Sequence, residues 1–190
     1  MLVGIDEAGR GTLAGSLFVA ACKFTQSTEQ KLIDELKDSK KLSEKKRFEL
    51  ALKLKKQSKF LILAFSNEMI DKLGLSTCIT RALQTIKKHF KDKEFLFDGN
   101  TNFKVSGIKT LIKADDKIPE VSAASILAKT SKDEEMINFS KIYPHYAFEK
   151  HKGYASKAHL EAILKFGVCK IHRKSFKIKS LEKEKSLFDQ

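Results

Sequence analysis

Short apolar runs alternate with longer amphipathic segments along the chain. Five runs rich in Val, Ile, Leu and Phe are bounded by Gly, Asn, Asp or Ser, and they predict buried or half-buried strands. The predicted strands cover residues 2–5, 16–24, 59–65, 94–97 and 108–112. Together with the helical segments between them, they predict an α/β protein in which one sheet carries helices on its faces.

The segments between and after these runs have helical character. Ser43 can cap a helix over residues 43–57, and Pro119 suits the first turn of a helix that runs to about residue 139. Further helices are predicted over residues 29–36, over 67–90 with a bend or interruption at Gly74, and over 156–166 between Ser156 and Gly167. Residues 174–190 alternate Lys, Ser and Glu, which predicts a helical extension or a loosely ordered tail.

Composition narrows the class of protein. The chain has 190 residues, which fits one domain, and 37 Lys and Arg against 24 Asp and Glu, a formal net charge of +13. Such an excess favours a polyanionic partner such as nucleic acid, without separating a binding module from an enzyme. We expect a cytoplasmic protein with no membrane span or signal peptide, and its three scattered cysteines indicate free thiols.

A few acidic residues stand directly after apolar runs in this basic chain. Asp6 and Glu7 follow the first run, Asp98 closes the fourth, and Asp115 follows the fifth. A carboxylate in such a position lies at the end of a sheet, where ligand sites of α/β folds commonly form. Asp6 and Glu7 would point to opposite faces of a regular strand, so their convergence requires the chain to leave strand geometry there.

Four clustered carboxylates would repel a phosphate backbone unless hard divalent cations lay between them. Oxygen ligands suit Mg²⁺ or Mn²⁺, and two such ions ~3.5–4 Å apart can activate a water and stabilise the leaving oxygen of a phosphodiester. The alternative is that each Asp is only a turn residue or a helix cap. Spacing alone leaves both interpretations open.

Five blocks, in order from residue 4 to residue 176, carry a family resemblance. They are GIDEAGRG from Gly4, DSKKLS from Asp38, FDGN from Phe97, KAD from Lys113 with IPEVSAASILAK from Ile118, and HKGY from His151 with KAH from Lys157 and HRKSF from His172. In this order they closely resemble the motifs of the ribonuclease HII family, the type 2 ribonucleases H. The resemblance implies a ribonuclease H-like fold, a five-stranded mixed sheet flanked by helices with a helical C-terminal extension. It divides the chain into a catalytic domain, residues 1–140, and a helical substrate-binding part and tail, residues 141–190, packed as one unit.

The resemblance also implies an activity. Members of the family cleave the RNA strand of RNA/DNA hybrids and incise 5′ of single ribonucleotides in duplex DNA, leaving 3′-hydroxyl and 5′-phosphate ends, in ribonucleotide excision repair and RNA primer removal. A monomer with two Mg²⁺ or Mn²⁺ ions is implied. Two alternatives remain: a non-catalytic basic nucleic-acid-binding module, and a type 3 ribonuclease H, which the chain resembles less because that family lacks the Arg of GRG.

The resemblance assigns roles to individual residues. It implies catalytic metal ligands at Asp6, Glu7, Asp98 and Asp115, the last chosen over Asp116 because the family ligand follows Lys-Gly, here Lys113-Ala114. It implies that Gly9, Arg10 and Gly11 grip the ribonucleotide and that Tyr154 stacks on the next deoxyribose and supports sensing of the 2′-hydroxyl.

Other candidate substrate contacts carry a structural alternative. Lys40, Lys41, Lys129 and Lys152 either contact phosphates or are solvated lysines, and Ser122 and Ser125 either bind phosphate or allow close helix packing. Thr12 and Ser16 stand where many family members have proline, and the absence of proline is expected to loosen the glycine-rich loop. Leu187 and Phe188 resemble the short peptides that dock repair enzymes on a sliding clamp, although the leading glutamine of such peptides is absent.

Overall fold

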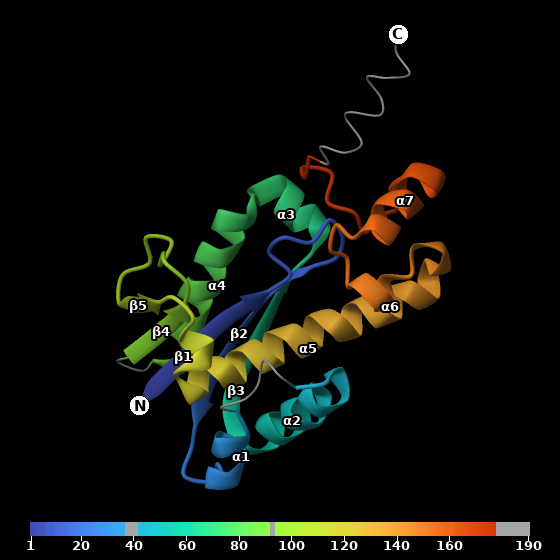
Figure 1. Ribbon diagram of the computed structural model, residues 1–190. Helices are drawn as coiled ribbons and strands as arrows, with labels where there is room; N and C mark the ends of the chain where they lie inside the picture. The colour runs from blue at the N-terminus through green and yellow to red at the C-terminus, as the bar shows by residue number, and fades with distance from the viewer. Residues whose placement is uncertain (37–41, 92–93, 178–190) are drawn as a thin grey trace.

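A five-stranded sheet in the order β3-β2-β1-β4-β5 forms the centre of the computed structural model, which describes residues 1–36, 42–91 and 94–177 (Figure 1). Strand β1 pairs antiparallel with β2, which pairs antiparallel with β3, whereas β1, β4 and β5 are parallel. The strands are β1 Leu2–Ala8, β2 Leu17–Phe24, β3 Ser58–Phe65, β4 Glu94–Asp98 and β5 Ile108–Leu111. All five predicted strands and the mixed sheet are therefore confirmed.

Strand β1 continues past its predicted end. Pairing with β2 runs as far as Ala8 opposite Phe18, so Asp6 and Glu7 both lie inside the strand. The expectation that the chain leaves strand geometry at these two acids is wrong. The antiparallel ladder with β2 keeps the backbone extended there, and the turn comes only at Gly9, whose φ is 86°.

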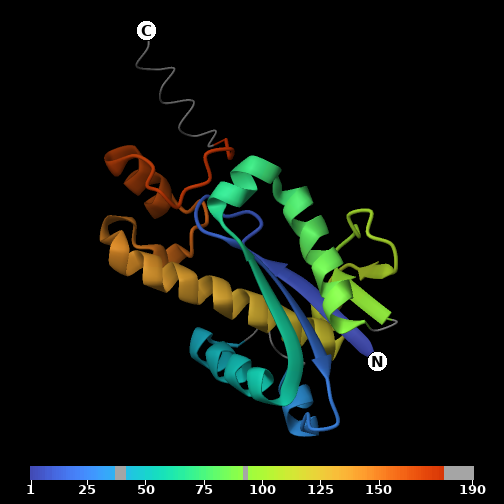
Figure 2. The same ribbon diagram turned by 180° about the vertical axis from the view of Figure 1, so that it is seen from behind.

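Helices cover both faces of the sheet. Helices α3 (Asn67–Leu73) and α4 (Leu75–Phe90) lie on one face, as the view from behind shows (Figure 2). Helices α1 (Gln30–Glu35), α2 (Glu44–Gln57) and α5 (Pro119–Ile142) cover the other. In β1 the side chains of Val3 and Ile5 belong to the apolar core under α4, and Ala8 belongs to the core under α5, as strand alternation requires.

Local sequence signals set several helix ends. Ser43 and Ser156 accept hydrogen bonds from the backbone at the start of α2 and α7 (Lys157–Phe166), and Pro119 is the first residue of α5. Gly74, with φ of 78°, separates α3 from α4, so the predicted segment 67–90 is two helices. Three short elements have no counterpart among the predictions: η2 Ala114–Asp116, η3 Pro144–Tyr146 and α6 Phe148–His151.

Glycine at position 4 allows α5 to begin directly against the sheet. A Cβ built on Gly4 would lie 2.2 Å from the carbonyl carbon of Glu120 and 2.3 Å from the nitrogen of Val121, in the first turn of α5. No larger residue fits without moving that backbone. This close approach brings the start of α5, and the turn before it, to the end of β1.

The C-terminal half of α5 packs in a third apolar cluster. Its Met136 packs with Tyr146, Phe148 and Ile163 from η3, α6 and α7, and with Leu13 from the loop after β1. The C-terminal helices therefore rest on α5 and on that loop. Within the described residues, no helix is both long and apolar enough to cross a membrane.

Candidate active site

Three of the four predicted acidic ligands meet at one end of the sheet. Ile5 and Phe97 are partners in the parallel β1–β4 ladder, so the next residues, Asp6 and Asp98, lie side by side on the same face. Asp115 joins them from η2, because Asp98 Oδ1 accepts a 2.8 Å hydrogen bond from the N–H of Ala114. Asp6, Asp98 and Asp115 each place a carboxylate oxygen within 4.8 Å of the others, and we call these three the acid cluster.

Glu7 lies beside the acid cluster and is not one of its three members. Strand alternation directs its side chain to the opposite face of β1 from Asp6. One carboxylate oxygen, Oε1, lies 3.5 Å from the Arg10 guanidinium, and the other, Oε2, is buried with no hydrogen-bond partner among the described residues. The predicted role of Glu7 as a ligand therefore stays a prediction.

Burial and the charges of neighbouring carboxylates raise the pKa values of Asp6 and Glu7. Asp6 is 7% exposed, and burial raises its pKa to about 8, with the Ser125 hydroxyl opposing and the Glu7 and Asp98 charges adding to the shift. Burial also raises the pKa of Glu7, and the neighbouring Arg10 charge opposes that shift. These carboxylates repel one another when all are charged, and a bound cation would relieve that repulsion. The buried Glu7 Oε2, which has no hydrogen-bond partner among the described residues, also indicates a cation nearby. The donor set therefore fits a hard divalent ion.

Ser125 contacts the acid cluster, which is a role that neither of its two predicted interpretations included. The sequence predicted either phosphate binding or close helix packing for Ser125, whereas its hydroxyl hydrogen-bonds to the Asp6 carboxylate. Ser125 and Lys129 are four residues apart on α5 and so share one face of the helix, which leads from the acid cluster toward Tyr154. The four-residue spacing of Ser125 and Lys129 is the sequence signal that could have indicated a polar face of α5 at the site.

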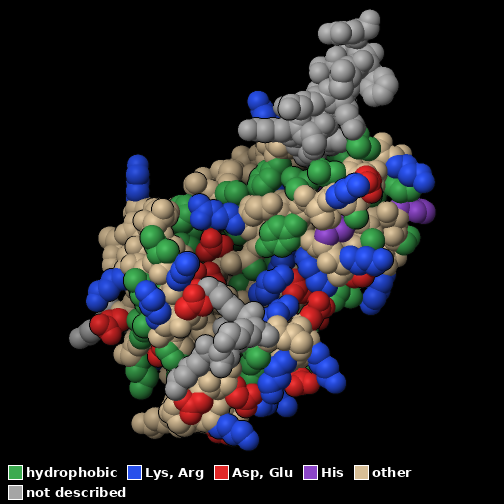
Figure 3. Space-filling view, viewed as in Figure 1, with side chains coloured by type: hydrophobic (Ala, Val, Ile, Leu, Met, Phe, Trp, Pro, Cys, Tyr) green, Lys and Arg blue, Asp and Glu red, His purple; other side chains and the backbone are tan. Residues whose placement is uncertain are grey.

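The loop after β1 lies next to the acid cluster and is held by buried cations. We call residues 9–16 the glycine loop. Arg173, which is 3% exposed, donates to three of its carbonyl oxygens, and Lys132, which is fully buried, donates to the carbonyl of Ala14 at 3.0 Å. Space-filling shows Asp and Glu side chains and Lys and Arg side chains gathered around a hollow on this face (Figure 3).

Thr12 and Ser16 add bonds to the glycine loop where loosening was expected. The Thr12 hydroxyl donates to the Gly9 carbonyl at 3.1 Å. The backbone N–H of Ser16 donates to Glu135 at 2.9 Å, and its hydroxyl donates to the same carboxylate. Each non-proline residue at these positions is thus tied into the protein.

Tyr154 presents a partly exposed ring and a firmly held backbone. Its side chain is 44% exposed, with Lys129 Nζ 6.0 Å from the ring centroid. Its carbonyl oxygen lies 2.8 Å from His159 Nδ1, whose Nε2 lies 3.0 Å from His172 Nε2. His172 Nδ1 accepts the N–H of Cys169 at 2.9 Å. This chain of bonds is satisfied only when both rings are neutral, and burial lowers the pKa of His159 to about 4.

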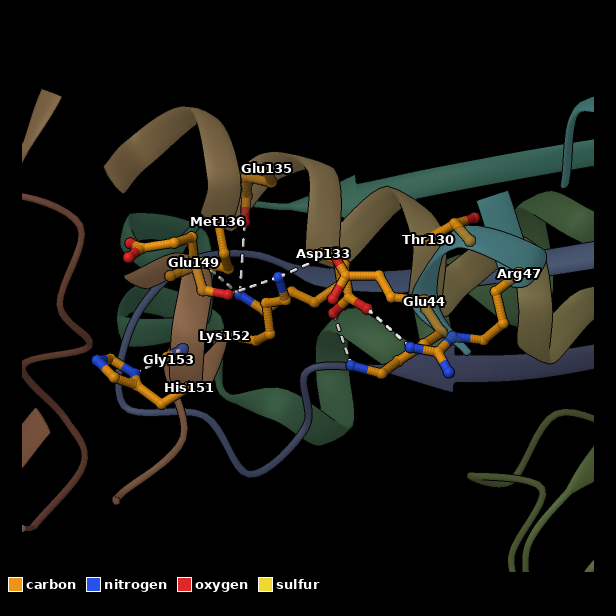
Figure 4. Close-up of polar contacts among 12 residues, drawn as sticks. Glu44, Arg47, Thr130, Asp133, Glu135, Met136, Glu149, His151, Lys152 and Gly153 are labelled. Carbon is orange, nitrogen blue, oxygen red and sulfur yellow. Dashed lines mark hydrogen bonds and ion pairs between the residues drawn. The ribbon is translucent and has the colours of Figure 1, made fainter. Parts of the chain in front are cut away.

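Two of the predicted phosphate contacts, Lys129 and Lys152, differ in exposure, and Figure 4 shows Lys152 among its neighbours. Lys129 is partly exposed, with its Nζ 2.6 Å from Asp133 Oδ1, and Arg47 lies 3.6 Å from the other oxygen of that buried carboxylate. Lys152 is 8% exposed, and its ammonium donates to Glu44 and to a backbone carbonyl of α6. Both lysines are therefore ion-paired within the protein, and Lys129 is the more exposed of the two, so its role as a phosphate contact stays a prediction.

The remaining predicted contacts are placed as follows. The Ser122 hydroxyl donates to the Leu36 carbonyl at 3.0 Å, and the side chain is 2% exposed, so it serves the packing of α5. Lys40 and Lys41 lie outside the described residues, as do Leu187 and Phe188.

Comparison with known proteins gives one consistent family. The model of the family Ribonuclease HII matches residues 3–179. Ribonuclease HII of Campylobacter jejuni strain 81-176 is 61% identical over 178 residues, 93% of this chain and 91% of that protein. The ribonuclease HII in a complex with PCNA from Archaeoglobus fulgidus is 27% identical, with a TM-score of 0.76 over 92% of both chains. The ribonuclease H2 of Pyrococcus horikoshii has the same fold, with a TM-score of 0.80 at 23% identity over 100% of this chain and 99% of that one.

Proposed function

The chain belongs to the ribonuclease HII family, and we propose that it incises duplex DNA on the 5′ side of single embedded ribonucleotides, as well as cutting the RNA strand of RNA/DNA hybrids. It is an endoribonuclease, a hydrolase of phosphodiester bonds. The proposed products carry 3′-hydroxyl and 5′-phosphate ends, as ribonucleotide repair and primer removal in the cytoplasm require. The observation that carries the proposal is the acid cluster lying directly beside the glycine loop.

The acid cluster and Glu7 are proposed to hold two divalent ions, Mg²⁺ or Mn²⁺. When bound, such ions supply an activated water and stabilisation of the departing 3′-oxygen. The protein's own part is to hold Asp6 and Asp98 side by side through strand register and to fix Asp115 through the bond from Ala114 to Asp98. The Ser125 hydroxyl orients the Asp6 carboxylate.

The glycine loop and Tyr154 are proposed to recognise the ribonucleotide. Gly9 turns the chain with φ of 86°, and Gly11 and the half-exposed Arg10 follow at the surface. Backbone without a Cβ can approach a sugar closely, and the 2′-hydroxyl is what distinguishes RNA from DNA. Lys129, whose Nζ lies 6.0 Å from the centroid of the Tyr154 ring, would neutralise a phosphate of the bound strand there.

The test is incision of a labelled DNA duplex that contains one ribonucleotide, with Mg²⁺, with Mn²⁺ and with chelator. We expect a single cut 5′ of the ribonucleotide in either metal and none in chelator. Extension by a polymerase and ligation then identify the 3′-hydroxyl and 5′-phosphate ends. Asp6→Asn is expected to bind the duplex and leave it uncut.

Other outcomes identify the alternatives. Binding of the duplex without a cut by the wild type would favour the non-catalytic module. Cutting of long hybrids with no cut at a single ribonucleotide would favour the type 3 activity. Wild-type rates from Asp6→Asn would contradict the assigned metal site.

We also propose that the protein acts as a monomer in which residues 141–190 serve substrate binding, and that Leu187 and Phe188 dock on a sliding clamp. The relative in a PCNA complex supports a clamp partner for this family. Removal of Leu187 and Phe188 is expected to abolish clamp binding, while removal of Asp189 and Gln190 alone leaves it unchanged. Equal clamp affinity in both truncations would remove the docking proposal.

A further inference from the structure

Arg173 is a buried cation whose hydrogen bonds all go to backbone carbonyls of the glycine loop. Its Nε donates to Gly15 at 3.0 Å, and its two terminal nitrogens donate to Arg10 at 3.1 Å and Gly9 at 2.6 Å. In the described part of the chain no carboxylate forms an ion pair with it. Burying a guanidinium is costly unless its donors are satisfied, so these three bonds make the loop's conformation inseparable from the arginine.

These bonds determine which way two loop amides point. The peptides are trans, so the carbonyl of one residue and the N–H of the next point in opposite directions. Because the Gly9 and Arg10 carbonyls face Arg173, the N–H groups of Arg10 and Gly11 face away from it. Both residues are exposed, and neither N–H donates a hydrogen bond to another group within the described ranges.

We propose that Arg173 is a positioning residue for ribonucleotide recognition: it holds the peptide planes after Gly9 and Arg10 so that two free N–H groups face the sugar–phosphate of the bound ribonucleotide. The inference rests on the proposed function, because it needs the glycine loop to be the recognition element. A 2′-hydroxyl oxygen or a phosphate oxygen accepts from such N–H groups. Arg173 itself touches no substrate in this account.

The guanidinium is suited to this role in a way that an ammonium is not. Its donors lie in one rigid plane and reach three carbonyls that are spread over seven residues of the loop. The backbone places it there: Arg173 N–H donates to the Leu13 carbonyl at 2.8 Å, and Gly15 N–H donates to the Ile171 carbonyl at 2.9 Å. A lysine at 173 would keep the charge and lose the simultaneous contacts.

The segment that carries Arg173 has a second anchor, which supplies a matched control. Asp71 of α3 accepts hydrogen bonds from the N–H groups of Lys174 and Ser175, both at 2.9 Å, and from the Ser175 hydroxyl at 2.6 Å. Asp71 holds the same segment without touching the glycine loop. Asp71→Asn therefore weakens the segment and leaves the three carbonyl contacts in place.

The experiment compares wild type, Arg173→Lys, Arg173→Gln and Asp71→Asn on two substrates, a duplex with one ribonucleotide and a long RNA/DNA hybrid. kcat, KM and thermal unfolding are measured for each. We expect both Arg173 variants to lose at least about 10-fold more kcat/KM on the single ribonucleotide than on the hybrid, because the hybrid offers a 2′-hydroxyl at every step. Asp71→Asn is expected to lower the unfolding temperature and keep the wild-type ratio between substrates.

Each outcome decides the proposal. An unchanged ratio in Arg173→Lys, or an equal change in Asp71→Asn, would reduce Arg173 to a structural residue. If Arg173→Lys does not fold, the ratio in Arg173→Gln decides, and failure of both to fold while Asp71→Asn folds would overturn a role limited to positioning. A wild type that cuts only hybrids would instead refute the proposed function.

Discussion

The acid cluster and the glycine loop lie side by side and are stabilised in opposite ways. In the acid cluster, carboxylates of one sign converge, and burial raises the pKa of Asp6 to about 8. In the glycine loop, buried cations from distant parts of the chain meet backbone carbonyls, as Arg173 and Lys132 do. The acid cluster needs divalent cations from solution to balance its charges, whereas the carbonyls of the glycine loop are bonded by side chains of the protein itself.

This difference separates chemistry from recognition. A site that must lower the energy of a developing charge benefits from groups held in place before the substrate arrives. Repulsion among the carboxylates favours cation binding at the acid cluster. The carbonyl contacts of the glycine loop, in contrast, fix the loop's conformation whether or not cations are bound. Substitutions in the acid cluster should therefore reduce cation binding and the cleavage rate, whereas substitutions that disturb the glycine loop should reduce recognition of the ribonucleotide.

The largest effect is expected at Asp115. Asp115→Asn removes one charge from the acid cluster and should lower the cleavage rate on the order of 1,000-fold, as expected when a transition-state contact is lost. Asp116→Asn changes the adjacent residue by the same chemistry and should stay within a few-fold of wild type. Cleavage assays at saturating Mg²⁺ check both. A reversed order would show that Asp116 is the ligand.

Gly4→Ala should cause the next largest change, in stability. The added Cβ meets the first turn of α5 at 2.2 Å, so the helix must shift, and the free energy of unfolding should fall by about 3 kcal/mol. Gly11→Ala in the glycine loop adds a methyl into open space and should change stability by under about 0.5 kcal/mol. Denaturant unfolding measures both, and equal losses would mean that the close helix approach is not what Gly4 provides.

Ser125→Ala tests the support of the acid cluster. Loss of the hydroxyl on Asp6 should weaken Mn²⁺ binding by about 10-fold, because groups that orient a ligand carboxylate contribute at that level. Thr85→Ala, which removes a hydroxyl bonded to the Arg81 carbonyl on the exposed face of α4, should leave the affinity unchanged. Calorimetric titration gives both values. Unaltered affinity in Ser125→Ala would limit the serine to packing.

The smallest effect is expected at His159, which supports the Tyr154 backbone, and it concerns how the free energy of unfolding depends on pH. Burial lowers the pKa of His159 to about 4, below its ordinary 6.5, so the unfolded chain takes up a proton at higher pH than the folded one. The free energy of unfolding should therefore fall as pH drops from about 6.5 to about 4, with His159 accounting for about 1 kcal/mol after solvent screening. His159→Gln should show a shallower slope in that window. Identical slopes would show that the neutral histidine pair does not hold the Tyr154 backbone.

Features that depend on local sequence patterns, such as strands and helix starts, could be predicted. The apolar runs predicted all five strands, and Ser43, Ser156 and Pro119 predicted three helix starts. Tertiary effects could not be predicted from local patterns: the ladder with β2 keeps Asp6 and Glu7 in a strand, and among the described residues Asp6, Asp98 and Asp115 form the acid cluster with Glu7 beside it. The contacts of Arg173 join residues up to 164 positions apart, and no spacing rule detects a bond of that range.

The most direct test of this division is Mn²⁺ binding, measured by calorimetry, in Asp6→Asn and Arg173→Lys side by side with the wild type. We expect Asp6→Asn to lose most of the Mn²⁺ affinity and Arg173→Lys to bind Mn²⁺ as the wild type does. Loss of Mn²⁺ binding in Arg173→Lys, or its retention in Asp6→Asn, would contradict the separation of a cation-dependent acid cluster from a self-sufficient glycine loop.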